Sequence, residues 1–177
     1  DRYKIPRLCF VNKMDRVGAD FERAVQSIRQ RLQTRPLILQ WPIGAADEFL
    51  GLIDLITMQA VYYKTDELGG NFEERAIPSD LSERAESARR EMIELLAETS
   101  EGVMDAYLHD RPLEPAVLRR AIREATLRRV LTPVLCGSSL KFVGVQRLLD
   151  AVCDYLPSPL DTPPVQAVNP LRPGATE

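Results

Sequence analysis

Several residue types and patterns are scarce in this sequence, and each absence excludes a class of protein. The chain has one histidine among 177 residues, and its three cysteines lack the spacing of a metal site. No stretch approaches the roughly 18 to 20 apolar residues that a membrane-spanning helix needs. Residues 1–4 lack the apolar core of a signal peptide. We therefore expect no metal site, no membrane partner, and a location in the cytoplasm or in an organelle matrix.

The sequence also lacks a large excess of positive or negative charge. The formal net charge of -3 argues against a protein that coats duplex nucleic acid. Arginine pairs at 119–120 and 128–129 are interpreted as solvated helix faces, with local contacts to RNA or acidic proteins as the alternative. The three cysteines, Cys9, Cys136 and Cys153, lie in apolar runs and are expected to be buried thiols in a reducing compartment.

The first segment reads as a strand, a loop and a helix. Residues 6–11 are mostly apolar and predict a buried strand that ends at Asn12. Asp20 is placed to cap a helix that runs to about residue 32. The apolar positions of this helix repeat on one face, at Phe21, Ala24, Val25, Ile28 and Leu32.

The middle of the chain has a different pattern. Strand-like runs at residues 36–43, 52–57 and 60–63 predict a small antiparallel sheet. Its aromatic residues, Trp41 among them, are expected in the core or on the sheet surface, with stacking on RNA bases as the alternative. Helices are predicted at about residues 80–99, 101–108 and 115–128, with Asp80 as a cap of the first and Pro115 in the first turn of the last.

The strand–loop–helix pattern returns near the end. Residues 131–136 predict a second buried strand, and residues 143–155 a helix whose inward positions are Val145, Leu148, Leu149, Val152 and Leu156. The predicted fold class is α/β, with residues 1–32 and 130–157 forming part of a parallel sheet. Residues 33–129 are expected to form an inserted α+β subdomain. The proline-rich residues 158–177 are expected to be a linker toward a domain outside this sequence.

The sharpest motif is Asn12-Lys13-Met14-Asp15, directly after the first strand. An N-K-x-D loop at a strand end is the guanine-recognition motif of GTPases, and the carboxylate of Asp15 can accept hydrogen bonds from the ring N–H and the exocyclic amine of guanine. Asn12 is expected to reach the base's other edge and to tie the loop to its neighbours, and the Lys13 stem to lie over the ring. A polar turn with a helix-capping aspartate is the alternative.

The second loop, Gly137-Ser138-Ser139-Leu140-Lys141, resembles the S-A-x loop of GTPases. The resemblance implies that the backbone N–H of Ser139 contacts the guanine carbonyl oxygen and that Ser138 steadies Asp15. Ser139 stands where the family usually has alanine, and we expect little effect because the backbone donor remains. The expected guanine-binding residues are Asn12, Lys13, Asp15, Ser138, Ser139 and Leu140.

Longer strings resemble the elongation factor G family of translational GTPases. They are residues 6–16 (PRLCFVNKMDR), 42–45 (PIGA), 51–55 (GLIDL), 144–146 (GVQ) and 154–159 (DYLPSP). The resemblance implies that the parallel strands are the C-terminal half of a P-loop-GTPase-type sheet. It also implies a parent GTPase that uses GTP to move transfer RNA and messenger RNA on the ribosome or to recycle ribosomes. It further implies partners in the ribosome, its RNA and the stalk proteins of its large subunit.

The phosphate-binding part of such a site is missing from these residues. There is no G-x-x-x-x-G-K-S/T loop, and the switch histidine of the family is not found. His109 is expected at the surface, and no catalytic residue is predicted. We expect these 177 residues alone to bind GTP or GDP weakly and not to hydrolyse GTP, with magnesium held by parts of the parent outside them. The alternatives are a module that docks ribosomal stalk proteins, a recycling-type paralogue and a ribosomal protection protein.

Overall fold

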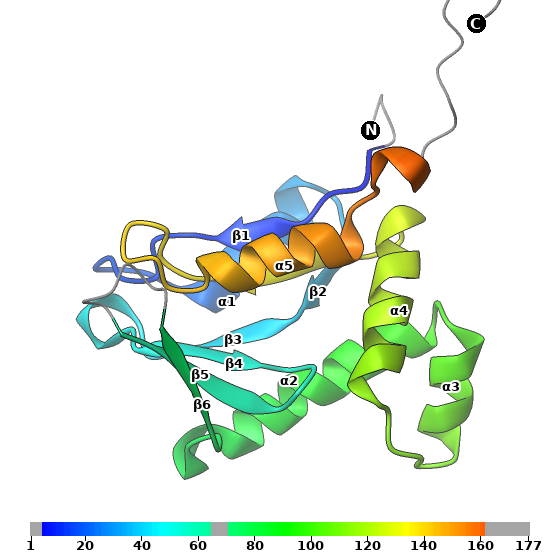
Figure 1. Ribbon diagram of the computed structural model, residues 1–177, viewed down its shortest axis with the longest axis horizontal. Helices are drawn as coiled ribbons and strands as arrows, with labels where there is room; N and C mark the ends of the chain where they lie inside the picture. Colours follow the sequence, from blue (N-terminus) through cyan, green and yellow to red (C-terminus); the bar gives the residue numbers. More distant parts are fainter. Residues whose placement is uncertain (1–4, 65–70, 162–177) are drawn as a thin grey trace, which may run out of the picture.

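The computed structural model describes residues 5–64 and 71–161, and this part of the chain contains two β-sheets (Figure 1). The first is parallel and has the strand order β1-β7-β2. It consists of β1 (Cys9–Val11), β2 (Pro36–Ile38) and, between them, β7 (Thr132–Cys136). The predicted pairing of the two strand–loop–helix units is confirmed, because β1 lies beside β7 with Val11 opposite Cys136. The α/β fold class is confirmed as well.

Helix α1 (Phe21–Arg31) begins where the sequence predicts. The side chain of Asp20 accepts a hydrogen bond from the backbone N–H of Arg23 at 2.9 Å, which satisfies one donor of the first turn. Phe21 and Val25 are buried on the predicted face. The ring of Phe21 meets Trp41 edge-on with centroids 5.2 Å apart, so Trp41 belongs to the core as expected.

The second sheet is antiparallel and has the order β3-β4-β5-β6. Its strands are β3 (Gln40–Ile43), β4 (Gly51–Asp54), β5 (Gln59–Tyr63) and β6 (Phe72–Arg75), with the short 3-10 helix η1 (Ala46–Glu48) between β3 and β4. Strand β6 is absent from the sequence prediction, because its charged sequence carries no apolar alternation. The ring of Phe72 packs on Tyr63 at 5.8 Å, and an ion pair joins Glu74 to Arg147. The strand is therefore held by contacts that local sequence does not show.

The run of residues 36–43 is divided between the two sheets, whereas the sequence prediction places all of it in the antiparallel one. Pro36–Ile38 pairs with β7 in the parallel sheet. Leu39 is the junction: its N–H donates to Val134 O and its carbonyl accepts from Leu55 N–H, both at 3.0 Å. The run is apolar apart from Gln40, and apolar character alone does not indicate which sheet a strand joins. The division of the chain into domains stays a prediction.

Three helices follow β6. They are α2 (Ser79–Ala97), α3 (Glu101–Leu108) and α4 (Pro115–Leu127). Pro115 occupies the first turn of α4 as predicted. The predicted cap of α2 is wrong: the helix begins one residue before Asp80, and Pro78 takes the cap position without a side-chain hydrogen bond. None of the helices in the described residues is both long enough and apolar enough to cross a membrane.

Helix α5 (Val145–Tyr155) crosses beside the parallel sheet and ends near the short 3-10 helix η2 (Pro159–Asp161) (Figure 1). Its buried residues are Ala151 and Tyr155, while Leu149 is 60% and Val152 40% exposed. The prediction that Leu149 and Val152 point inward is wrong. The helix is rotated so that the stripe through Ala151 and Tyr155 faces the protein.

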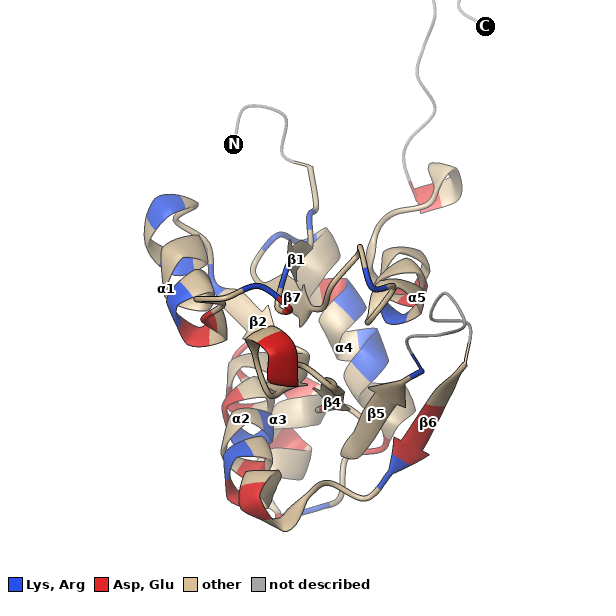
Figure 2. Ribbon diagram, turned by 90° about the vertical axis from the view of Figure 1, so that its left-hand side faces the viewer, with Lys and Arg blue, Asp and Glu red and all other residues tan. Residues whose placement is uncertain are grey.

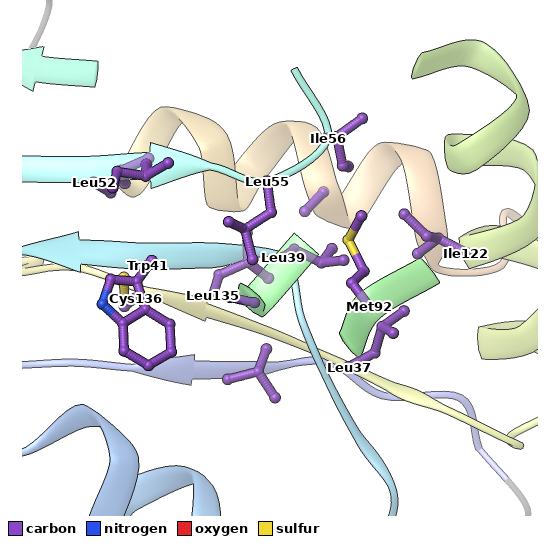
Figure 3. Packing of buried hydrophobic residues seen from close by; sticks show 14 of the residues in the cluster. Leu37, Leu39, Trp41, Leu52, Leu55, Ile56, Met92, Ile122, Leu135 and Cys136 are labelled. Atoms are coloured by element: carbon purple, nitrogen blue, oxygen red, sulfur yellow. The ribbon is translucent and has the colours of Figure 1, made fainter. Parts of the chain in front are cut away.

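One continuous apolar core joins both sheets to the helices, as Figure 3 shows. Leu37 and Leu135 come from the parallel sheet, Leu55 follows the antiparallel strand β4, and Met92 and Ile122 come from α2 and α4. All five are almost fully buried. The two sheets therefore share a single core.

The cysteines differ from the expectation of three buried thiols. Cys136 is buried, Cys9 is half-buried, and Cys153 is exposed on α5. Burial raises the pKa of the Cys136 and Cys9 thiols, because a thiolate is poorly stabilised away from water. The prediction for Cys153 is wrong for the same reason as that for Val152: the orientation of α5 is set by its packing.

Replacing Leu55 by alanine should lower the free energy of unfolding by about 2–5 kcal/mol, because it leaves a cavity in the shared core. The matched change Leu149→Ala on the exposed face of α5 should alter it by about 0.5 kcal/mol or less. Urea unfolding followed by circular dichroism measures both. Equal losses for the two variants would contradict the observed orientation of α5.

Candidate functional site

The two predicted loops leave the same edge of the parallel sheet. The first loop (Asn12–Asp15) follows β1, and the second loop (Ser138–Lys141) follows β7 after Gly137. Because β1 and β7 are adjacent and parallel, both chains emerge at the carboxyl ends of their strands. This is the edge at which open α/β sheets bind ligands.

Main-chain hydrogen bonds hold the two loops together. The N–H of Gly137 donates to Val11 O at 3.0 Å, and the N–H of Met14 donates to Gly137 O at 3.1 Å. The Met14 side chain is 2% exposed, so it anchors the first loop in the core. A Cβ atom at Gly137 would lie 2.3 Å from Val143 O, so only glycine fits this close approach.

Asn12 and Ser139 form a side-chain bridge between the loops. The Nδ2 of Asn12 donates to Ser139 Oγ at 2.9 Å. The Oδ1 of Asn12 accepts from the backbone N–H of Ser139 at 2.9 Å, from its hydroxyl at 3.1 Å and from the backbone N–H of Lys13 at 2.8 Å. The predicted tie between Asn12 and the neighbouring loop is therefore present.

Asp15 is half-buried, and its surroundings lower the pKa of its carboxyl group. The largest cause of the lowered pKa is a hydrogen bond from the Ser138 side chain to the Asp15 carboxyl group, and partial burial of Asp15 opposes this shift. The backbone N–H of Asp15 and the positive charges of Lys141 and Arg16 lower the pKa further. Ser138 is fully buried, and its Oγ also accepts a hydrogen bond from the backbone N–H of Lys141 at 3.4 Å. A carboxylate held in this way can accept hydrogen bonds from a ligand with two adjacent N–H donors.

Lys13 and Leu140 lie at the exposed parts of the loops. The backbone of Lys13 has φ 64°, in the left-handed region, and its carbonyl accepts from Arg16 N–H at 3.1 Å to close a tight turn. The side chain of Leu140 is 72% exposed. Both side chains are exposed to solvent.

The antiparallel sheet also contacts the loops, which the sequence analysis did not anticipate. The N–H of Ala46, in η1, donates to Met14 O at 2.8 Å. The side chain of Gln40, which is 4% exposed, accepts from Cys136 N–H at 3.2 Å just before the second loop. The Gln40–Cys136 pair is separated by 96 residues, and neither contact has a local sequence signal.

Comparison with known proteins assigns a family. Residues 1–158 match the family described as the elongation factor Tu GTP binding domain. The chain belongs to this family. The match covers both loops and both sheets, so the geometry above belongs to a GTP-binding domain.

Individual relatives agree with this family. The chain is 49% identical over 169 residues to elongation factor G of Petrotoga mobilis and 48% identical over 169 residues to that of Neorickettsia sennetsu. Each alignment covers 96% of this chain and 24% of the relative, so the chain spans about a quarter of their length. The resemblance to elongation factor G is therefore confirmed.

A solved structure from Thermus thermophilus has a similar fold. Its TM-score is 0.77 at 31% sequence identity, and the match covers 90% of this chain and 23% of the solved chain. The arrangement of two sheets around one core therefore recurs in a much longer protein.

The structure places the predicted residues of this GTP-binding domain in two groups. Asn12, Asp15, Ser138 and Ser139 are joined by hydrogen bonds across the two loops. Lys13 and Leu140 flank them at the surface. Their roles toward guanine stay predictions.

Metal ligands are not part of this arrangement. Among residues 5–64 and 71–161, no group of three or more His, Cys, Asp or Glu side chains could hold a metal ion. His109 is exposed, as predicted, and its Nδ1 lies 2.8 Å from the carbonyl oxygen of Asp105.

The variant Ser138→Ala should raise the pKa of Asp15 toward its ordinary value, because the hydroxyl is the main cause of the lowered pKa. Carbon-detected NMR of the carboxyl groups during a pH titration measures this. The pKa of Asp161, which is lowered mainly by hydrogen bonds from Ser158, serves as an internal control and should not move.

The sign of the effect on stability follows from the same shift. The lowered pKa means that Asp15 binds its proton less tightly in the folded state than in the unfolded chain. The ionised Asp15 therefore stabilises the fold at pH values above the unfolded pKa, and this stabilisation is lost as the pH falls through the folded pKa. The stability difference between wild type and Ser138→Ala should therefore shrink on acidification. A difference that grows on acidification would contradict this.

Proposed function

We propose that this chain reads the guanine base of GTP and GDP in a translational GTPase related to elongation factor G. The observation that carries the proposal is the fixed pair of Asp15 and Ser138 beside the Asn12–Ser139 bridge, in a chain of the GTP-binding family. Asp15 accepts two hydrogen bonds, from the ring N–H and from the exocyclic amine of guanine. Adenine offers no such pair of donors.

The remaining residues complete the pocket in this proposal. The stem of Lys13 and the side chain of Leu140 cover the ring, and their exposure supports this role. The N–H of Ser139 contacts the guanine carbonyl oxygen, and Asn12 lies toward the base's other edge. The Ser139 N–H already donates to Asn12, so the base must share or take over this donor.

The proposed parent protein uses GTP to promote translocation or recycling on the ribosome. Two similar proteins that carry the name elongation factor G support this proposal. Phosphate binding, magnesium and hydrolysis belong to parts outside these residues, and the residues here supply base selection. The proposed partners are the ribosome with its stalk proteins and RNA, and the proposed location is the cytoplasm or an organelle matrix.

The test is a titration of the chain with GDP, inosine diphosphate and ADP, followed by amide NMR. We expect GDP to shift the resonances of both loops, inosine diphosphate to bind more weakly because it lacks the exocyclic amine, and ADP to bind least. Asp15→Ala should reduce the preference for GDP over ADP by about ten- to a hundred-fold, because the paired acceptor is lost.

The control variant is Asp47→Ala. Asp47 is an exposed carboxylate in η1, close to the first loop in structure but outside the proposed pocket. It should leave the preference for GDP unchanged. Equal binding of GDP and ADP by the wild-type chain would overturn the proposed guanine site.

A further inference from the structure

The hydroxyl of Ser139 has a role that its backbone does not share. It accepts from Asn12 Nδ2 at 2.9 Å and donates to Asn12 Oδ1 at 3.1 Å. The backbone N–H of the same residue also donates to this oxygen. Ser139 therefore engages both ends of the Asn12 carboxamide. The GTPases whose loop this segment resembles usually have alanine at this position. Alanine could make only the backbone contact.

The loops do not need this hydroxyl to stay together. Main-chain hydrogen bonds from Gly137 to Val11 and from Met14 to Gly137 already pin them, and the buried Met14 side chain anchors the first loop. The distinct effect of the hydroxyl is thus on the carboxamide alone. It holds Nδ2 of Asn12 toward Ser139.

We propose that the Ser139 hydroxyl competes with the purine base for the Asn12 carboxamide and so lowers the affinity of this site for guanine nucleotides. The inference rests on the proposed guanine site. In this proposal the carboxamide turns toward the base when the base enters, and its two hydrogen bonds with the Ser139 hydroxyl oppose this rotation. Serine at this position makes binding weaker and nucleotide exchange faster than alanine would.

Exposure of the Asn12–Ser139 bridge to water limits the size of the effect. Both Asn12 and Ser139 are exposed, so each hydrogen bond in the bridge is also in competition with water. Removing one such bond changes an equilibrium constant by about two- to ten-fold. Ser139→Ala should therefore tighten GDP binding by about this factor.

The experiment is a double-mutant cycle in the 177-residue chain, with GDP as the ligand. Ser139→Ala should tighten binding when Asn12 is present and should have no effect in the Asn12→Ala background. Ser139→Thr, which keeps the hydroxyl, should bind like the wild type. Ser100→Ala is the control, because Ser100 precedes α3 without a side-chain capping bond.

A second measurement needs no nucleotide. Exchange of the Asn12 carboxamide protons with water, followed by NMR, should be faster in Ser139→Ala and unchanged in Ser100→Ala. Unaltered exchange, or GDP binding by Ser139→Ala that is equal to or weaker than wild type, would overturn the competition while leaving the guanine site intact. Absence of GDP binding in every variant would overturn the guanine site itself, and the role of Ser139 with it.

Discussion

The parallel pairing of β1 with β7 is the constraint on which the candidate site depends. It places Val11 opposite Cys136, so that both following loops begin at one edge of the sheet. The hydrogen bond from Met14 to Gly137 extends this pairing beyond the strands. Side chains 127 residues apart can then meet, as Asn12 and Ser139 do. Without this register the carboxylate of Asp15 would have no partner from the second loop.

The antiparallel sheet is part of the same structural unit. Leu39 bonds to both sheets, and the core around Leu55 is continuous with that of the parallel strands. Ala46 and Gln40 contact the chain beside the two loops. Contacts from β3 and η1 therefore help to hold the chain at both loops. Figure 2 shows acidic and basic residues mixed along α2, whereas α1 carries three arginines, at 23, 29 and 31, and one acidic residue, Glu22.

Local signals in the sequence were sufficient to predict much of the secondary structure. An apolar strand followed by N-K-x-D, a capping Asp20 and the first-turn Pro115 each act within a few residues, so their effects can be read without the fold. The same holds for the choice of residues at the site. A carboxylate at position 15 and a hydroxyl at position 138 define which donors and acceptors are available to a ligand.

Only the tertiary structure decided which partners these groups have. The sequence could not place Pro36–Ile38 in the parallel sheet, because an apolar strand pairs equally well with either neighbour. It could not orient α5, since Leu149 and Ala151 are both apolar and packing selects between them. The sequence by itself determined the chemistry of the loops and the class of the fold. Strand register and core packing, which depend on contacts between distant residues, determined that the Ser139 hydroxyl holds Asn12.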